Sequence, residues 1–359
     1  MTRTNKLNGY LCANGWEEAL SQELVAAKAG DHFYSPAPGL VVGESSSAGL
    51  RYEPVFAGQW FPDCMEVEGD SIADLIQALG NALDPILDQN PLPWTLHCFT
   101  PDLYTEDSTY YEFLSGRSAL LHEKFMQRMA KYRRRALEKY VDWSSIDEKR
   151  PCLLIQAVLV DTGYLWVSTA KRLKTELGRF VPFMRSNSPG SIAHDPQAPC
   201  RSYYKLEEAW QVAGIYPRKG EVCIDLGAAP GGWTWAALKR GARVVAVDFA
   251  DLRPHVENHP HCEHSLENGY AFMPARTVDW MFCDMIVKPL ATLGLLDRWL
   301  EQKACRKFVV NVKFRGKQPE SILTAIEELR QKHQIPQLIV KHLYYDRNEI
   351  TLIGGQLKV

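Results

Sequence analysis

Hydrophobic positions in the second half of the chain fall into short apolar runs separated by amphipathic segments. The runs predict buried parallel strands, and the segments between them have helical spacing, as at 206–215 and 319–334. The predicted strands are 222–224, 243–247, 278–283, 307–312, 337–343 and 350–353. Strands that alternate with helices indicate a mostly parallel sheet. The connection 344–349 is too short for a parallel crossover, so the last strand is predicted to be antiparallel.

The first half of the chain has the mixed pattern of α+β structure. A first unit, 1–90, has predicted strands at 8–11, 40–42 and 52–60 and predicted helices at 16–27 and 72–86. A second unit, 91–180, has a predicted strand at 94–100, a long helix at 118–141 and a hairpin of 152–160 with 164–170. The segment 181–200 contains four prolines and predicts a linker, which leaves 201–359 as the domain with the parallel sheet.

A glycine-rich loop follows the first parallel strand. It reads Gly-Ala-Ala-Pro-Gly-Gly from Gly227 to Gly232, soon after a strand that ends at Asp225, and the next strand ends at Asp248. Glycines allow a close approach of backbone to ligand. The loop lacks the G-x-G-x-x-G pattern of a pyrophosphate site, and acidic groups suit a ligand with positive charge and a ribose, such as S-adenosylmethionine. The alternative is a tight turn that only packs helix on strand, but two strands that each end in aspartate favour a ligand.

Composition limits how this protein could bind a nucleic acid. The formal net charge is −2, so any contact with nucleic acid must come from a local patch. One basic run lies on the predicted helix 118–141 and includes Lys124, Arg128, Lys131, Arg133, Arg134 and Arg135. We interpret this run as an RNA-contacting stripe, although a solvated helix face explains it almost equally well.

Cysteine usage indicates the compartment. The nine cysteines are scattered without a C-x-x-C pair, which is typical of a reducing compartment, and no apolar run is long enough to span a membrane. We therefore expect a cytoplasmic protein. The histidines at 255–264 do not have the spacing of a zinc site, so no metal is expected.

Four ionisable residues lie at ends of predicted elements where α/β sheets place their sites. Lys205 opens a helix, Asp284 and Lys313 end strands, and Glu349 begins the last strand. A hydroxyl nucleophile needs a base, and a lysine can serve when a nearby cation or desolvation lowers its pKa from about 10.4. We predict that Lys313 is this base, with Lys205 as the second cation and the two acids holding the geometry.

The segments that carry these residues resemble a known family. SYYKLEEAW, DLGAAPGGWT, VVAVD, FCDM, NVKF and DRNEITL are similar in order and spacing to the RlmM-type 23S rRNA ribose 2′-O-methyltransferases, and more broadly to FtsJ/RrmJ-type enzymes. The resemblance implies a Rossmann-like S-adenosylmethionine-dependent methyltransferase domain, with a mostly parallel sheet and an antiparallel last strand, preceded by an α+β ferredoxin-like and THUMP-type region. It implies methylation of a cytidine in 23S rRNA, either free or in an early assembly intermediate.

The resemblance also implies roles for single residues. Lys205, Asp284, Lys313 and Glu349 fall on the family's catalytic tetrad, with Lys313 as proton acceptor. The implied S-adenosylmethionine contacts are Ser202, Asp225, Gly227, Ala229, Pro230, Gly231, Gly232, Trp233, Asp248, Asn268 and Asp284. Asn268 departs from the aspartate that is usual in the family, but its amide oxygen can still accept a hydrogen bond from an adenine.

Two other functions compete with this interpretation. A base-directed cytosine methyltransferase needs a nucleophilic cysteine after a late strand, whereas both Pro-Cys pairs, at Cys152 and Cys200, precede the ligand loop. A non-catalytic RNA-binding or ribosome-assembly protein is the second alternative. The set of two lysines and two acids argues against it.

Overall fold

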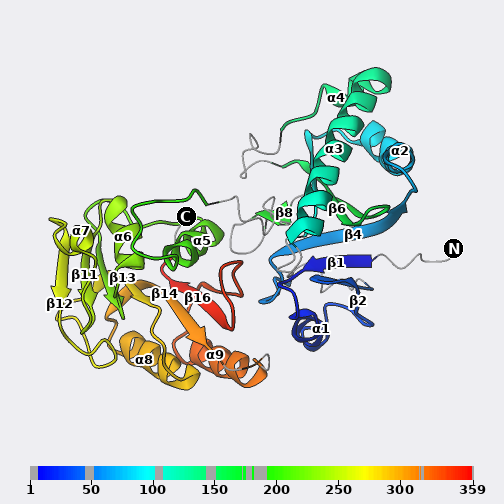
Figure 1. Cartoon of the computed structure of the whole chain (residues 1–359). Helices are drawn as coiled ribbons and strands as arrows, with labels where there is room; N and C mark the ends of the chain where they lie inside the picture. The colour runs from blue at the N-terminus through cyan, green and yellow to red at the C-terminus, as the bar shows by residue number, and fades with distance from the viewer. Residues whose placement is uncertain are drawn as a thin grey trace. The chain divides into compact units, whose positions relative to one another are not determined.

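The chain folds into two compact units, which the computed structural model divides between residues 189 and 190 (Figure 1). The structure describes residues 7–44, 52–101, 108–142, 151–171, 173–174, 180–181, 192–314, 316 and 319–357. The division falls within the predicted linker 181–200, of which residues 182–191 lie outside the described ranges.

The first unit is built on one seven-stranded sheet with the order β2-β3-β1-β4-β7-β6-β5. Its strands are β1 Leu7–Leu11, β2 Tyr34–Ala37, β3 Leu40–Glu44, β4 Gln59–Glu68, β5 Trp94–Phe99, β6 Leu153–Asp161 and β7 Tyr164–Lys171, and a separate small ladder joins β8 Leu173–Lys174 to β9 Phe180–Val181. The predicted hairpin is confirmed as β6 and β7. Because β4 pairs with β7, the two predicted α+β units share a single sheet.

The predicted strand at 52–60 is wrong, since the strand in this region is β4 and begins at Gln59. The segment before it is bound to a helix instead. The Glu23 carboxylate of α1 Glu17–Ala26 accepts hydrogen bonds from the Tyr52 hydroxyl and from the backbone N–H groups of Val55 and Phe56. These contacts use backbone donors that a strand would have placed in a ladder.

Two long helices pack on one part of this sheet. They are α2 Ile72–Gln89 and α3 Ser108–Tyr132, and their apolar residues form one buried cluster with β5, β6 and β7. The predicted helix 118–141 is wrong in its bounds, because α3 ends at Tyr132 and a short α4 Arg134–Leu137 follows. The backbone of Arg133 interrupts the helix with φ −135° and ψ 43°. The basic run from Lys124 to Arg135 is therefore divided between α3, the break at Arg133 and α4.

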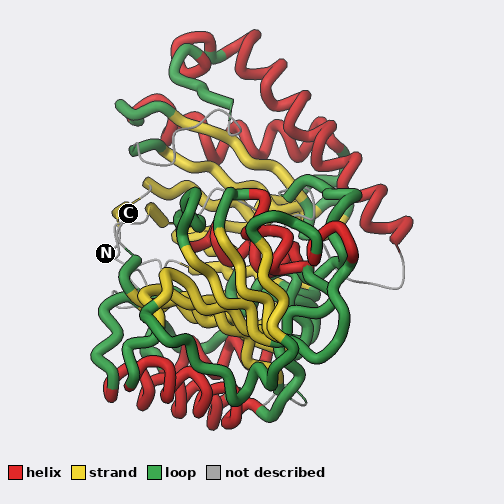
Figure 2. Tube along the Cα trace, turned by 90° about the vertical axis from the view of Figure 1, so that its left-hand side faces the viewer, coloured by secondary structure: helices red, strands yellow, loops and turns green. Residues whose placement is uncertain are grey.

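The second unit has a second seven-stranded sheet with the order β12-β11-β10-β13-β14-β16-β15. Figure 2 shows strands of this sheet, in yellow, lying side by side. Its strands are β10 Val222–Leu226, β11 Arg243–Val247, β12 Cys262–Ser265, β13 Val278–Cys283, β14 Cys305–Lys313, β15 Leu338–Lys341 and β16 Glu349–Gly355. The pairs from β12 through β14 are parallel, whereas β16 runs antiparallel to both of its neighbours, as predicted. The strand β12 was not predicted.

Helices cover both faces of this sheet, which gives a Rossmann-like three-layer fold (Figure 1). They are α5 Tyr203–Ala213, α6 Gly232–Lys239, the single-turn α7 Pro254–Glu257, α8 Pro289–Glu301 and α9 Glu320–Lys332. The strand order reverses at β10, which lies between β11 and β13. Ligand sites of open α/β sheets form at such a switch point. No helix in the described part of the chain is long and apolar enough for a membrane span.

Candidate functional site

The predicted site residues of the second unit gather at one edge of its sheet. The loops with Gly227, Asp248, Asn268 and Asp284 follow the carboxyl ends of β10, β11, β12 and β13, and Lys313 ends β14. Glu349 begins the antiparallel β16, so its residue also lies at this edge, opposite Lys313. The topology therefore explains why residues from 202 to 349 can form one site.

Glycine is required at several points in the loop after β10. Gly227 and Gly231 have φ values of 77° and 108°, which side chains rarely adopt. A Cβ atom on Gly227 would lie 2.4 Å from Cγ of Met285 in the loop after β13, and one on Gly232 would lie 2.5 Å from Oγ of Ser202. The neighbouring loops thus approach the glycine loop closely from two sides.

Asp248 fits the predicted ribose contact. Its Oδ2 accepts a hydrogen bond from the backbone N–H of Ala229, and its Oδ1 accepts one from Ala250, both at 3.0 Å. Each carboxylate oxygen keeps a further lone pair, so this half-buried side chain can also accept from two neighbouring hydroxyls. The set of acceptors fits the ribose of S-adenosylmethionine and also holds the glycine loop in place.

Asp225 and Trp233 lie deeper than a direct ligand contact requires. The Asp225 side chain is buried and accepts a hydrogen bond from the Thr234 hydroxyl at 2.7 Å. Burial raises the pKa of Asp225 to about 7. Trp233 is buried, and its indole N–H donates to the backbone oxygen of Ser202 at 2.9 Å. Both side chains therefore position the loop and α6 from inside.

Asn268 lies on the exposed loop after β12. Its Oδ1 accepts a hydrogen bond from the backbone N–H of Tyr270 at 2.9 Å. Gly269 follows, and a Cβ atom there would lie 3.2 Å from Sδ of Met285. The loops after β12 and β13 thus meet beside the loop after β10.

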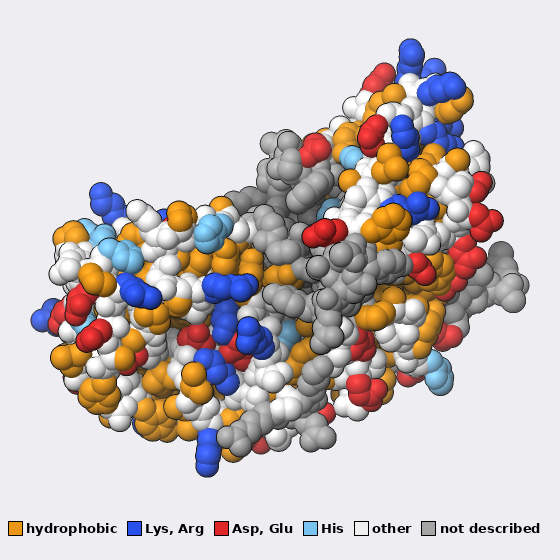
Figure 3. Space-filling view, viewed as in Figure 1, with side chains coloured by type: hydrophobic (Ala, Val, Ile, Leu, Met, Phe, Trp, Pro, Cys, Tyr) orange, Lys and Arg blue, Asp and Glu red, His pale blue; other side chains and the backbone are white. Residues whose placement is uncertain are grey.

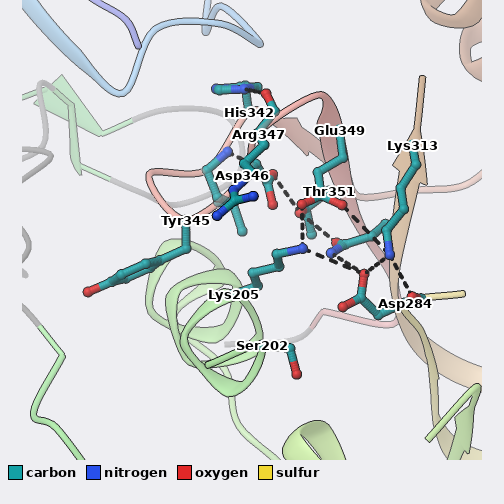
Figure 4. Close-up of polar contacts among 12 residues, drawn as sticks. Ser202, Lys205, Asp284, Lys313, His342, Tyr345, Asp346, Arg347, Glu349 and Thr351 are labelled. Carbon is teal, nitrogen blue, oxygen red and sulfur yellow. Dashed lines mark hydrogen bonds and ion pairs between the residues drawn. The ribbon is translucent and has the colours of Figure 1, made fainter. Parts of the chain in front are cut away.

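The four residues of the predicted catalytic set form a closed ring of alternating charge (Figure 4). Lys313 Nζ lies 2.9 Å from Asp284 Oδ1, and Lys205 Nζ lies 3.7 Å from the same oxygen. Lys205 also forms an ion pair with Glu349 Oε1, and Lys313 lies 3.9 Å from Glu349 Oε2. The sequence predicted these four residues, and the structure brings them together.

Lys205 is held as a cation within this ring. Burial alone lowers the pKa of Lys205, but the charges of Asp284 and Glu349 outweigh burial, so the pKa is raised. Its ammonium group therefore stays protonated near neutral pH. Lys205 thus supplies a fixed positive charge beside the two carboxylates.

The hydrogen bonds of Lys313 suit an amine that accepts a proton. Its Nζ donates to the backbone oxygen of Asp284 at 2.7 Å and lies within hydrogen-bond distance of Asp284 Oδ1. A neutral amine has two N–H donors and one lone pair. When both donors are directed to these two oxygens, the lone pair remains for a hydroxyl proton. The ammonium group that forms is then stabilised by the Asp284 carboxylate.

Two acidic residues near the ring were not singled out from the sequence. Glu208 on α5 accepts hydrogen bonds from the backbone N–H groups of Tyr344 and Tyr345, at 2.8 and 3.1 Å. Burial raises the pKa of Glu208 to about 7. Asp346 lies in the same connection before β16 and is buried. The contact between α5 and the connection before β16 joins residues more than 130 positions apart, so no local sequence signal could have identified these acids.

The predicted basic stripe in the first unit does not form a single surface. Arg128 forms two hydrogen bonds with the Asp84 carboxylate, at 2.7 and 3.0 Å, and Arg133 pairs with both Asp84 and Asp88 of α2. Arg128 therefore joins α3 to α2, and Arg133 joins the break between α3 and α4 to α2. The side chains of the other four basic residues are exposed; these are Lys124, Lys131, Arg134 and Arg135. Figure 3 shows basic side chains gathered around the end of α3 and α4.

The cysteines at this edge of the sheet are poor nucleophiles. Cys283, next to Asp284, is buried, and burial raises its pKa to about 12. The thiolate form needed for attack on a base is therefore scarce. Cys200 is half-buried and its sulfur contacts the Ser202 hydroxyl at 3.0 Å.

Comparisons with known proteins agree with this geometry. A family model described as FtsJ-like methyltransferase matches residues 198–328. A protein from Thauera aminoaromatica, named ribosomal RNA large subunit methyltransferase M, is 30% identical over 377 aligned residues, covering 96% of this chain and 94% of the relative. A protein of the same name from Marinobacter nauticus is 41% identical over 165 residues, which are 43% of this chain and 46% of the relative.

The chain thus spans about half the length of the Marinobacter relative in that match and nearly all of the Thauera relative. Among solved structures, 1,6-didemethyltoxoflavin-N1-methyltransferase from Burkholderia thailandensis matches 43% of this chain and 81% of its own, with 16% identity and a TM-score of 0.31. A likeness of that size carries no argument about function.

Proposed function

Because the chain belongs to the ribosomal RNA large subunit methyltransferase M family, we propose that it methylates a ribose 2′-hydroxyl of a cytidine in 23S rRNA. The proposed methyl donor is S-adenosylmethionine, and the proposed place of action is the cytoplasm. The observation that supports this proposal most directly is the ring formed by Lys205, Asp284, Lys313 and Glu349. Neither a base-directed methyltransferase nor a purely RNA-binding protein requires such a ring at this edge of the sheet.

The chain's own residues account for the proposed proton transfer. Neutral Lys313 takes the proton of the hydroxyl, and Asp284 and Glu349 stabilise the ammonium group that results. Lys205 compensates one of the two carboxylate charges, and the positive charge that Lys313 gains in the transfer compensates the other. S-adenosylmethionine supplies a methyl group on a sulfonium, which leaves as a neutral thioether. The remaining requirement is orientation of the reacting atoms, which the converging rim loops provide.

The residues proposed to hold S-adenosylmethionine lie beside this ring. Asp248 would accept from the ribose hydroxyls, and the backbone from Gly227 to Gly232 would approach the ligand closely. Ser202 and Asn268 would contact it from the two flanking loops. Asp225 and Trp233 would act indirectly, by holding the loop and α6 in position.

We propose that the first unit binds RNA through its exposed basic residues Lys124, Lys131, Arg134 and Arg135. The finer assignment of this unit as a ferredoxin-like and THUMP-type region belongs to the same proposal. Neutralisation of phosphates by surface lysines and arginines gives affinity without sequence selectivity. Selection of the nucleotide would then depend on the methyltransferase unit.

The test is a methylation assay on a 23S rRNA transcript with labelled S-adenosylmethionine, followed by mass spectrometry of the nucleosides. The expected product carries the methyl group on the ribose of a cytidine. A methyl group on a base would support the base-directed alternative. RNA binding without transfer on both naked transcript and assembly intermediates would support the non-catalytic alternative.

A further inference from the structure

Behind Asp284 a chain of buried polar side chains leads away from the ring. Asn311 Nδ2 donates to Asp284 Oδ1 at 3.0 Å. Thr351 Oγ1 lies 2.7 Å from Asn311 Oδ1 and 2.9 Å from Asp346 Oδ2. Asn311 and Thr351 are fully buried and lie opposite each other in the pairing of β14 with β16.

The orientation of the Asn311 amide follows from its neighbour. Asp284 is an ionised acceptor, because Lys313 and Lys205 both pair with its Oδ1. The amide group that faces it must therefore be the NH₂ donor, since an amide oxygen there would repel the carboxylate. The amide oxygen consequently faces Thr351, so Thr351 must give its only hydroxyl proton to Asn311.

This arrangement leaves one short contact without a proton. Thr351 Oγ1 and Asp346 Oδ2 lie at hydrogen-bond distance, yet the Thr351 proton is directed to Asn311. Asp346 Oδ2 also accepts from the backbone N–H of Leu343 at 2.9 Å, and that N–H cannot serve Thr351. A proton between the two oxygens must therefore come from the Asp346 carboxyl group itself.

The surroundings of Asp346 agree with a neutral carboxylic acid. Its side chain is buried, it forms no ion pair with the described residues, and its Oδ1 has no hydrogen-bond partner among them. The charged groups that face it are Glu349 at the start of β16 and Lys205 and Glu208 on α5. Burial, followed by the Glu349 charge, raises the pKa of Asp346 well above its usual value.

We propose that Asp346 is a positioning residue that acts in its protonated form and fixes Asp284 through Thr351 and Asn311. Because Asp346 donates its proton to Thr351, the Thr351 hydroxyl must donate to Asn311. That hydrogen bond fixes the orientation of the Asn311 amide. The amide in turn holds the Asp284 carboxylate in the position where it pairs with Lys313. This inference rests on the proposed role of Lys313 as the base. Asp346 itself would not touch the substrate, but it would determine the position of Asp284, which pairs with the proposed base Lys313.

The first test is spectroscopic. Infrared difference spectra at neutral pH, with ¹³C-labelled aspartate, compare the wild-type protein with Asp346→Asn. We expect the wild type to have a protonated carboxyl C=O band that the variant lacks. Other protonated acids contribute equally to both proteins and cancel. If Asp346→Asn does not fold, Thr351→Val should shift the same band, because the acid loses its acceptor. The proposal would be overturned if the spectrum of Asp346→Asn contained the same protonated carboxyl bands as the wild type, or if Thr351→Val did not shift the Asp346 band.

The second test is kinetic. Thr351→Val should lower kcat about tenfold, because the hydrogen bonds that connect Asp346 to Asn311 are lost, with KM for RNA and S-adenosylmethionine affinity unchanged. Thr351→Ser should restore kcat. Thr292→Val is the matched control, because Thr292 is also fully buried in this unit and its hydroxyl has no partner among the described residues. A Thr351→Val enzyme with wild-type kcat would contradict the positioning role.

These outcomes are separable from failure of the proposed function. If Lys313 proves dispensable, or if the methyl group is found on a base, the proposed reaction is wrong whatever the state of Asp346. The infrared measurement reports the Asp346 proton without any turnover. If the wild-type protein has the Asp346 carboxyl band but Thr351→Val has wild-type kcat, the proposed reaction remains intact and only the positioning role is rejected.

Discussion

Lys313 and Glu349 lie directly opposite each other in the antiparallel pairing of β14 with β16. One residue ends a strand and the other begins one, so antiparallel pairing places both at the same edge of the sheet. The parallel strands bring Asp284 to that edge as well, and α5 supplies Lys205. The ring of charges therefore depends on the one strand that runs against the others.

The first prediction concerns the base. Lys313→Ala should fold and bind S-adenosylmethionine normally, and its methyl transfer should fall by roughly 10² to 10⁴, as removal of a general base typically costs. Lys313→Arg should be nearly as inactive, because a guanidinium group does not release its proton near neutral pH. Single-turnover assays on the natural RNA measure both. Near wild-type turnover of Lys313→Arg would reject the base assignment.

The second prediction concerns the ligand. Asp248→Ala should weaken S-adenosylmethionine binding by about 1–3 kcal/mol, since ribose hydroxyls lose an acceptor and the Ala229 N–H loses its partner. Calorimetry measures the change. The wild-type protein should bind S-adenosylmethionine and not NAD, and the reverse preference would contradict the interpretation of the glycine loop.

The third prediction separates two kinds of arginine in the first unit. Changing exposed Arg134 and Arg135 to Ala should lower RNA affinity and reduce the slope of log K against log salt by about 0.7 to 0.9 for each phosphate that is no longer neutralised. S-adenosylmethionine binding should not change. Filter binding at several salt concentrations provides the measurement, and an unchanged slope would mean that these side chains form only a solvated face.

Arg128→Ala is the matched contrast. Its guanidinium group pairs with Asp84 in two hydrogen bonds, so this change should lower the free energy of unfolding of the first unit by about 1–3 kcal/mol. Its effect on the salt slope should be small. Denaturant unfolding checks the first statement, and a fully stable variant with a reduced slope would show that Arg128 contacts RNA after all.

The fourth prediction is a pH dependence of stability. The pKa of Asp225 is about 7 in the folded protein, against 3.8 as its ordinary value. Between these values the folded state keeps a proton that the unfolded chain releases. Stability from this group is therefore complete below about pH 4 and is lost as pH rises through about 7. Asp225→Asn should flatten this part of the profile in denaturant unfolding, and an identical profile would contradict it.

The sequence predicted most of the second unit because its signals are local. The strand of Cys223 ends in a glycine loop, and Lys313 and Asp284 end apolar runs, so each could be assigned to one edge before any contact was known. In contrast, the role of Arg128 depends on Asp84, and the failure of the predicted strand at 52–60 depends on Glu23. These partners are distant in the sequence and follow only from packing.

The position of β16 has a consequence for synthesis of the protein. This strand is the last of the described strands to leave the ribosome, yet it lies between β14 and β15 rather than at an edge. In a nascent chain the sheet therefore lacks β16 until Glu349 and Thr351 have emerged, and β14 cannot pair with β16 before then. A partly synthesised chain could fold its first unit while it still lacked the acid that completes the ring. The ring of Lys205, Asp284, Lys313 and Glu349 is thus completed only once β16 has been synthesised.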